Sequence, residues 1–148
     1  MTKIIILDTN FLLIPAQFKV DIFSEIERIC NFKYQLVVID KTLEELQDIA
    51  ASSRGKDSRA SKLAIKMINK ISNIREEDNI KNNIKNNIKI LKTSEEYSKH
   101  YADRIIIETA EKNKDVIVAT QDRELKRILK DKNTQLIVMK NKSYLDFA

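Results

Sequence analysis

The chain has 148 residues, of which 43% are hydrophobic and 33% are charged, and its formal net charge is +5. This length and composition are typical of one folded domain, and the positive charge is compatible with a nucleic-acid partner. We expect neither a membrane span nor a signal peptide, because no apolar run has the required length or flanks. The single cysteine, Cys30, excludes an internal disulfide and favours a cytoplasmic location. The single glycine, Gly55, excludes a glycine-rich phosphate loop.

The first half of the chain alternates short apolar runs with helical patterns. Residues 3–7 read Lys-Ile-Ile-Ile-Leu, which predicts a strand buried on both faces. Residues 21–30 carry apolar side chains at helical spacing, and residues 36–39 read Leu-Val-Val-Ile, which predicts a second strand. Residues 42–51 and 58–74 repeat the helical pattern and predict two further helices.

The second half begins with a polar stretch, residues 75–87, in which Asn-Asn-Ile-Lys occurs twice. We interpret this stretch as a variable, partly helical connection. Residues 88–91 predict a short third strand. A capping box of Thr93 and Glu96 predicts the start of the next helix. One face of that helix carries Ala102, Ile105, Ile106 and Thr109.

The last three predicted elements are a strand, a helix and a final strand, over residues 115–119, 121–130 and 136–139. Strands therefore alternate with helices through most of the chain. This order predicts an α/β fold, a three-layer α/β/α sandwich with a central parallel sheet. Since no linker rich in Pro, Gly and Ser divides the chain, we expect a single domain over residues 1–148.

Acidic residues occur at the ends of the predicted strands, where the crevice of an open parallel sheet lies. Asp8 directly follows the first strand, Glu45 lies early in the helix after the second, and Asp122 follows the strand over residues 115–119. Asp103 lies on the preceding helix and reaches the same edge if that helix packs there. Because four neighbouring carboxylates repel one another, such a cluster takes up protons or holds a cation.

Carboxylate oxygens favour Mg²⁺ or Mn²⁺. A zinc site is disfavoured, because His100 is the only histidine and no cysteine pair exists. A metal held by carboxylates suits the hydrolysis of phosphodiesters, since it activates water and neutralises charge on the phosphate. Each acid also has a structural alternative, as a turn former (Asp8), a surface residue (Glu45), an ion-pair partner (Asp103) or a helix cap (Asp122).

Four motifs follow one another along nearly the whole chain. They are Asp8-Thr9-Asn10 followed by Phe11-Leu12-Leu13, Leu43-Glu44-Glu45-Leu46, Tyr101-Ala102-Asp103 followed by Ile105 and Ile106, and Val118-Ala119-Thr120-Gln121-Asp122-Arg123-Glu124-Leu125-Lys126. In this order they resemble the motifs of PIN-domain ribonucleases. The first and fourth look most like the archaeal and eukaryotic rRNA-processing branch, which includes the nuclease of the small-subunit processome. The chain also resembles VapC-like members.

The resemblance implies a catalytic, metal-binding set of four acids, which are Asp8, Glu45, Asp103 and Asp122. The ligand would be one or two Mg²⁺ or Mn²⁺ ions. The resemblance also gives two residues supporting roles, in which Asn10 positions the acids and Thr120 orients a carboxylate or a water. It implies the α/β sandwich already predicted, and many members of the family are homodimers.

Two features depart from the family pattern. Many relatives carry a second acid directly after the aspartate of the third motif, where this chain has Arg104. An arginine there would neutralise part of the cluster or contact a phosphate oxygen, which places a full second metal site in question. The Asn-rich residues 79–87 have no counterpart in the family pattern. The choice of Glu45 over Glu44 rests on the following Leu46.

Cations near the acids would hold the phosphates that flank the scissile one. We favour the stretch from Arg54 to Arg59 around Gly55, because it resembles a mobile rim loop, and the helix after the last acid offers further cations. The candidate RNA-binding residues are Arg54, Lys56, Arg59, Arg104, Arg123 and Lys126. For any single one, a solvated helix face is an equally good interpretation. Tyr97 or Tyr101 would stack on bases, although we expect Tyr101 to pack in the core.

We therefore expect a Mg²⁺- or Mn²⁺-dependent endoribonuclease that acts in rRNA processing or RNA maturation. The alternatives are a VapC-like toxin of a toxin–antitoxin pair and a non-catalytic scaffold that keeps the PIN fold and binds RNA. Expected partners are RNA, a second copy of the chain, and an antitoxin or a ribosome-assembly protein. A structure-selective DNA nuclease is disfavoured, because the chain lacks room for an arch and for extensions that bind duplex DNA.

Overall fold

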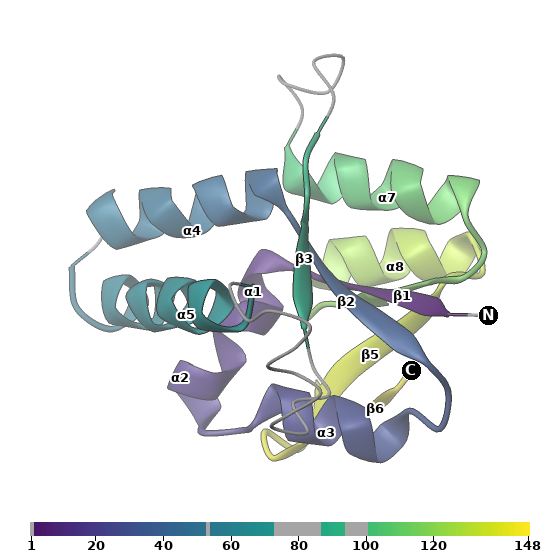
Figure 1. The fold of residues 1–148 in the computed structure, drawn as a ribbon, viewed down its shortest axis with the longest axis horizontal. Coiled ribbons are helices and arrows are strands. Elements are labelled where there is room, and N and C mark those ends of the chain that lie inside the picture. Colours follow the sequence, from purple (N-terminus) through teal and green to yellow (C-terminus); the bar gives the residue numbers. More distant parts are fainter. Residues whose placement is uncertain (1, 53, 73–86, 94–100) are drawn as a thin grey trace.

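The computed structural model describes residues 2–52, 54–72, 87–93 and 101–148. These residues form one six-stranded sheet with the order β3-β2-β1-β4-β5-β6 (Figure 1). The strands are β1 (Lys3–Leu7), β2 (Tyr34–Ile39), β3 (Ile88–Leu91), β4 (Val116–Ala119), β5 (Gln135–Lys140) and β6 (Tyr144–Phe147). Strands β1 to β5 are parallel to their neighbours, and β6 pairs antiparallel with β5.

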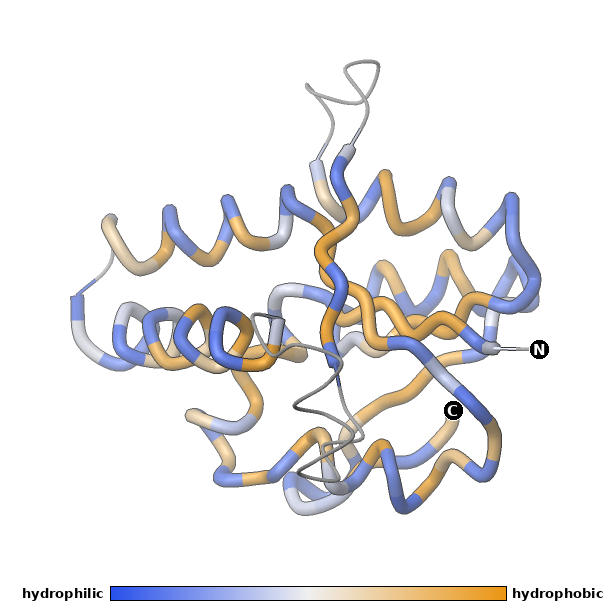
Figure 2. The backbone as a smooth tube through the Cα atoms, in the orientation of Figure 1, coloured by the Kyte–Doolittle hydropathy of each residue, from blue (hydrophilic) through white to orange (hydrophobic). Residues whose placement is uncertain are grey.

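Helices connect most of these strands. They are α1 (Thr9–Leu12), α2 (Ile14–Phe18), α3 (Ile22–Ile29), α4 (Asp40–Ser52), α5 (Lys56–Ser72), α7 (Ala102–Lys112) and α8 (Arg123–Asp131). Along the longer helices, hydrophilic and hydrophobic residues alternate, whereas the central strands are mostly hydrophobic (Figure 2). This contrast follows from burial, since a central parallel strand is covered on both faces and a surface helix on one side.

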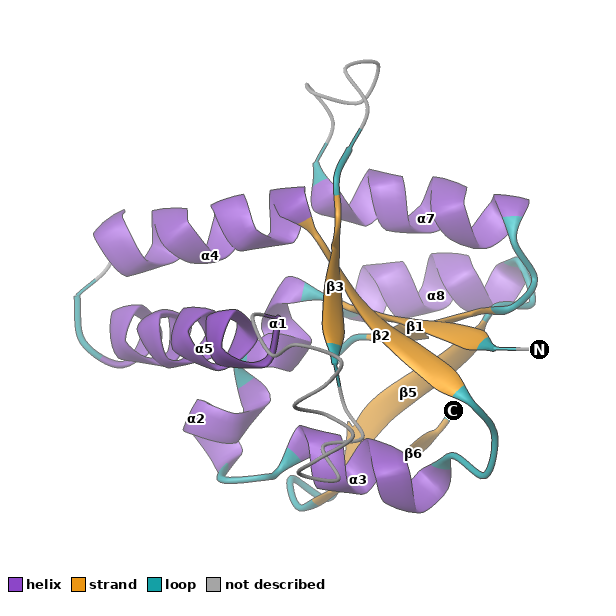
Figure 3. Cartoon of the chain, in the orientation of Figure 1, coloured by secondary structure: helices purple, strands orange, loops and turns teal. Residues whose placement is uncertain are grey.

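Two hydrophobic clusters, one on each face of the sheet, divide the molecule into layers. Helices α7 and α8 pack on one face through Ile106 and Leu129, and α1 to α5 pack on the other (Figure 3). Successive side chains of β1 point to opposite faces of the sheet, so Ile5 and Leu7 pack in one cluster and Ile6 packs in the other. The predicted three-layer α/β/α fold is therefore confirmed, although the sheet is mixed and not wholly parallel.

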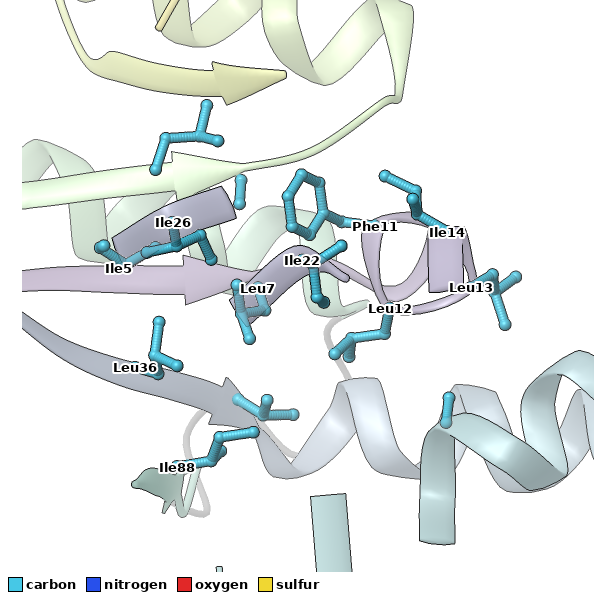
Figure 4. Packing of buried hydrophobic residues seen from close by; sticks show 14 of the residues in the cluster. Ile5, Leu7, Phe11, Leu12, Leu13, Ile14, Ile22, Ile26, Leu36 and Ile88 are labelled. Atoms are coloured by element: carbon cyan, nitrogen blue, oxygen red, sulfur yellow. The ribbon is translucent and has the colours of Figure 1, made fainter. Parts of the chain in front are cut away.

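The larger cluster holds the first helices against the strand ends. Phe11 and Leu12 of α1 are buried beside Leu7 of β1, with Ile22 of α3 packed nearby (Figure 4). Each fully buried side chain of this size contributes about 1.5–3 kcal/mol by leaving water. This packing fixes the backbone directly after β1, where Asp8 lies.

Three elements were not predicted. Strand β6 follows the strand predicted to be the last, and it is reached through Asn141 and Lys142, whose φ values are 52° and 53°. Two successive residues of positive φ are the geometry of a tight antiparallel hairpin. Helices α1 and α2 also lie in a segment to which the sequence patterns assigned no element.

The predicted start of the helix that carries Ala102 and Ile105, which is α7 in the structure, is wrong. Helix α7 begins at Ala102, after Tyr101 in extended conformation, and not at the capping box of Thr93 and Glu96. Thr93 instead donates its backbone N–H to Asp40 Oδ2 at 2.9 Å and its hydroxyl to Asp40 Oδ1, which ties β3 to the start of α4. Glu96 and most of the predicted connection over residues 75–87 lie outside the described residues. No described helix has the length and apolarity to span a membrane.

Candidate active site

Asp8 lies where β1 ends and α1 begins. Its backbone N–H donates to the Ala119 carbonyl of β4 at 3.0 Å, and its carbonyl accepts from the Leu12 N–H at 3.2 Å. The backbone N–H of Asp8 thus continues the sheet, and its carbonyl begins helix α1. Its backbone is extended, as at a helix N-cap, but its side chain makes no capping hydrogen bond. Only 7% of the residue is exposed, so its carboxylate is free of a capping role yet largely removed from water.

Thr120 connects two of the predicted acids. Its hydroxyl donates to Asp8 Oδ2 at 2.7 Å and accepts from the Asp122 N–H at 3.1 Å. The residue is fully buried, and its backbone N–H donates to the Ile137 carbonyl of β5 at 3.2 Å. A fully buried hydroxyl with both a donor and an acceptor in place has one favoured orientation. Thr120 therefore fixes the rotamer of the Asp8 carboxylate.

Asn10 and Gln121 form a second connection beside the first. Asn10 Oδ1 accepts from the Gln121 N–H at 3.0 Å, and Gln121 Oε1 accepts from the Met139 N–H of β5 at 2.7 Å. These two amides hold the loop after β4 between α1 and β5. The sequence singled out Asn10 but not Gln121, whose contact partner is known only once β5 is placed.

Glu45 enters the site from α4. Its Oε2 accepts from the Thr9 hydroxyl at 2.6 Å, and its Oε1 accepts from the Ala102 N–H at 3.4 Å. One carboxylate thus joins α4 to the start of α1 and to the start of α7. Its neighbour Glu44 is exposed and pairs with Lys41 at 3.2 Å, so the structure places Glu45, and not Glu44, toward the pocket.

Asp103 and Asp122 lie at the starts of α7 and α8, and both are exposed. Asp122 caps α8, since its Oδ1 accepts from the Leu125 N–H at 2.8 Å, as the structural alternative for this residue proposed. Asp103 Oδ1 accepts from the Arg104 N–H at 2.8 Å. In both residues the second carboxylate oxygen, Oδ2, accepts no hydrogen bond from the described part of the chain and is available to a ligand.

All four predicted acids line one pocket of about 370 Å³. In Figure 1 the first turns of α1, α4 and α7, which carry or adjoin most of these acids, lie beside the ends of β1 and β2. The lining consists of Asp8, Thr9, Asn10, Leu13, Glu45, Ile49, Tyr101, Asp103 and Asp122. No Lys or Arg is among these residues. Within the described chain, however, no three acidic, His or Cys side chains are close enough together to hold one ion as they stand.

The electrostatics of the pocket centre on Asp8. Burial raises the pKa of its carboxyl, and the negative charges of Glu45 and Asp122 raise this pKa further. Hydrogen bonds from Thr120 and from the Thr9 backbone act in the opposite direction but do not outweigh burial. The ionised form of Asp8 is therefore held at a cost, which a nearby positive charge would offset.

The donor set fits a hard divalent cation. Among the residues that the structure describes, the pocket offers carboxylate oxygens from four separate elements and no sulfur or imidazole ligand, which is the ligand chemistry of Mg²⁺ and Mn²⁺. Asp8 is held in one orientation by Thr120, whereas Asp103 and Asp122 are exposed and each keeps one carboxylate oxygen without a hydrogen bond from the described residues.

The predicted RNA-binding cations lie in three different places, outside the pocket lining. Arg104 pairs with Glu108 within α7 at 3.4 Å. Lys56 and Arg59 belong to helix α5, not to a rim loop as expected, and line a separate pocket beside α2. Arg54 lies between the end of α4 at Ser52 and the start of α5 at Lys56. Arg123 and Lys126 lie on α8, directly after Asp122.

Tyr101 corrects another expectation. It was predicted to pack in the core, but 80% of it is exposed and it lines the acidic pocket beside Asp103. Its position as the N-cap of α7 turns the side chain outward, because the residue before a helix does not share the helix's buried face. Tyr97, the other candidate for base stacking, lies outside the described residues.

The fold and the pocket together define a class of proteins. Residues 5–142 match the family model described as "PIN like domain". The chain belongs to the PIN-domain family, as the four sequence motifs predicted.

Two known proteins are similar to it over most of their length. Ribonuclease VapC4 from Methanocaldococcus jannaschii is 33% identical over 144 residues, which cover 96% of this chain and 94% of the relative. Among solved structures, the PIN domain endonuclease Utp24 aligns with a TM-score of 0.69 and 20% identity. That alignment covers 97% of this chain and 90% of the other, and it shows a shared fold.

Proposed function

We propose that this chain is a divalent-metal-dependent endoribonuclease that hydrolyses RNA phosphodiester bonds. One observation carries the proposal: carboxylates from four elements far apart in sequence line a single pocket, and no lysine or arginine is among its described lining residues. The similarity to ribonuclease VapC4 supports RNA as the substrate. Membership of the PIN-domain family supports nuclease chemistry over other uses of an acidic pocket.

Asp8, Glu45, Asp103 and Asp122 would hold the ion or ions in this proposal. When bound, Mg²⁺ or Mn²⁺ supplies a Lewis acid that activates water and neutralises charge on the phosphate. The chain's own contribution is orientation. Thr120 fixes the Asp8 carboxylate and Thr9 fixes the Glu45 carboxylate, so neither has to be ordered when the substrate arrives.

The proposal is tested by Asp8→Asn, which keeps the shape of the side chain and removes its charge. We expect cleavage of a single-stranded RNA to fall by about a thousandfold or more, since groups that act as a unit fail together. The matched control is Asp48→Asn, an exposed acid on α4 that does not line the pocket. Undiminished cleavage by Asp8→Asn would reject the assignment.

Titration calorimetry with Mn²⁺ tests the metal separately from cleavage. We expect a binding heat from the wild-type chain and from Asp48→Asn, but none from Asp8→Asn. A wild-type chain that gives no heat and cuts no RNA would favour the non-catalytic scaffold. The structure weakens that alternative, because Arg104 pairs with Glu108 and does not reach into the acids.

For the biological role, we propose rRNA processing or another step of RNA maturation. The second candidate, a VapC-like toxin with an antitoxin partner, is favoured by the likeness to ribonuclease VapC4. Depletion of the chain separates the two, because accumulation of unprocessed rRNA supports maturation. A small antitoxin gene directly upstream, together with growth arrest when the chain is expressed alone, supports the toxin.

A further inference from the structure

A basic groove of about 650 Å³ lies between α8 and β5, apart from the acidic pocket. Four of its cations come from one face of α8, namely Arg123, Lys126, Arg127 and Lys130, and Lys140 comes from β5. Val138 and Ala148 complete the lining. No acidic side chain is among these residues, so the groove is the opposite of the acidic pocket in charge.

The charge of the groove is largely uncompensated. Arg127 pairs with Glu124 at 2.5 Å and with Asp131 at 3.8 Å, so its charge is used within α8. The other four cations, Arg123, Lys126, Lys130 and Lys140, form no ion pair with any residue that the structure describes. Four neighbouring cations without counter-ions repel one another, and an anionic ligand would relieve that repulsion.

The spacing of these cations fits a chain of phosphates. Arg123, Lys126 and Lys130 share one face of the helix and span about 10 Å along its axis, because each residue rises about 1.5 Å. Lys126 and Lys140 are partly buried, so their aliphatic stems lie along the protein surface while their ammonium groups face solvent at the groove. A row of cations matches the repeating charge of a polyanion.

Adjacent residues of the chain line the acidic pocket and the groove. Asp122 lines the pocket and caps α8, and Arg123, the next residue, is the first cation of the groove. We propose that this groove binds the backbone phosphates of the RNA that flanks the cleaved bond. The inference rests on the proposed ribonuclease function, and it makes the substrate an RNA long enough to extend past the pocket along α8.

The decisive variant removes one cation from each wall, Lys130→Gln together with Lys140→Gln. Its matched control is Lys66→Gln together with Lys70→Gln, two exposed lysines of α5 that line none of the pockets described above. Both double variants lose the same charge. The probe is a fluorescent single-stranded 20-nucleotide RNA, roughly the length that a groove-binding chain needs to cover its site, and binding is measured in EDTA so that no cleavage occurs.

We expect the groove variant to raise Kd about tenfold near 100 mM salt and to lower the slope of log Kd against log salt by about 1.4, the value for two lost phosphate contacts on a single strand. The control should bind as the wild type does. Lys130→Arg with Lys140→Arg should restore binding, which separates lost charge from misfolding. Equal affinities for the groove variant and the control would overturn the proposal.

A cleavage assay tests this inference separately from the nuclease proposal. On the long RNA, the groove variant should raise KM and leave kcat unchanged, whereas a dinucleotide, too short to reach the groove, should be cut at the wild-type rate. A fall in kcat on the dinucleotide would place these lysines in the chemistry and refute a flanking-phosphate role. If Asp8→Asn retains full activity while the groove variant binds weakly, only the nuclease proposal fails.

Discussion

Asp8 and Glu25 each accept a hydrogen bond from a segment more than a hundred positions away, but their pKa values shift in opposite directions. Asp8 in the acidic pocket accepts from Thr120, 112 positions away, and Glu25 on α3 accepts from the Leu145 N–H of β6, 120 positions away. Burial, with the charges of Glu45 and Asp122, raises the pKa of Asp8. Hydrogen bonds from Arg28 and Leu145 lower the pKa of Glu25.

The difference comes from the presence or absence of a cation. Glu25 is paired with Arg28 at 2.9 Å, and Arg28 also donates to the Leu145 carbonyl at 2.8 Å. At this contact between α3 and β6, the charge of the carboxylate is therefore balanced by a cation. The pocket around Asp8 has acids but no cation among the lining residues that the structure describes. A carboxylate balanced by a cation stabilises the fold. A buried carboxylate without a cation is available for a ligand, which is why a raised carboxyl pKa points to function.

Among the variants that test this comparison, we expect the largest effect from Thr120→Val, which keeps the shape of the side chain and removes its hydroxyl. We expect kcat to fall by about 10–100-fold, since groups that orient ligating residues contribute on that scale. The pKa of Asp8 should also rise further, so the acidic limb of the pH–activity profile should move to higher pH. Thr120→Ser, which keeps the hydroxyl, should retain both properties. Equal activity of the two variants would show that the hydroxyl does not matter.

The next largest effect concerns Glu25, which is paired with Arg28 and accepts from Leu145. Glu25→Ala should destabilise the chain by about 1–3 kcal/mol, because it leaves the partly buried Leu145 N–H without its acceptor. A thermal unfolding scan at neutral pH measures the change, and Glu44→Ala, which breaks a pair within one helix, should shift Tm much less.

The pH dependence of this loss has a fixed sign. A lowered folded-state pKa contributes stability above the ordinary value of 4.5, and that stability disappears as the pH falls through the folded-state pKa. The charge-dependent part of the Glu25 contribution should therefore fade in acid. A loss of the same size at all pH values would mean that only packing is involved.

The smallest expected effect has the opposite sign. Asp8→Asn should raise Tm at neutral pH without added metal, by roughly 2–4 °C for each kcal/mol regained, because it removes a buried charge that costs stability. A raised folded-state pKa penalises the fold at high pH, so the gain should shrink as the pH falls through that pKa toward 3.8. A lower Tm for Asp8→Asn at neutral pH would contradict the comparison between the two carboxylates.

Much of the fold was predictable because the amino-acid composition of most of its strands is itself typical of buried strands. Strands β1 to β5 appear in the sequence as short β-branched runs, which a sheet covered on both faces requires. Strand β6 has only four residues, and its hairpin uses Asn141 and Lys142 at positive φ without a glycine. The usual turn signal is therefore missing, and this strand is defined by its pairing with β5.

The site was predictable to the extent that topology determines it. The acids were chosen because parallel strands end at one edge, and the structure places all four in one pocket. The contacts that orient them were missed where they depend on tertiary placement. Thr9 reaches Glu45 only because α4 lies beside α1, and Gln121 reaches Met139 only because β5 lies beside the loop after β4. Tyr101 was misplaced because a helix cap follows no apolar periodicity.

The position of β1 in the middle of the sheet has a consequence for the time at which the chain becomes active. One neighbour of β1, β4, is synthesised more than a hundred residues later, and Thr120 and Asp122 follow directly after it. While the chain is still emerging from the ribosome, Asp8 and Glu45 therefore lack the partners that complete the pocket. A pocket assembled in this way cannot form before the chain has been synthesised as far as Asp122.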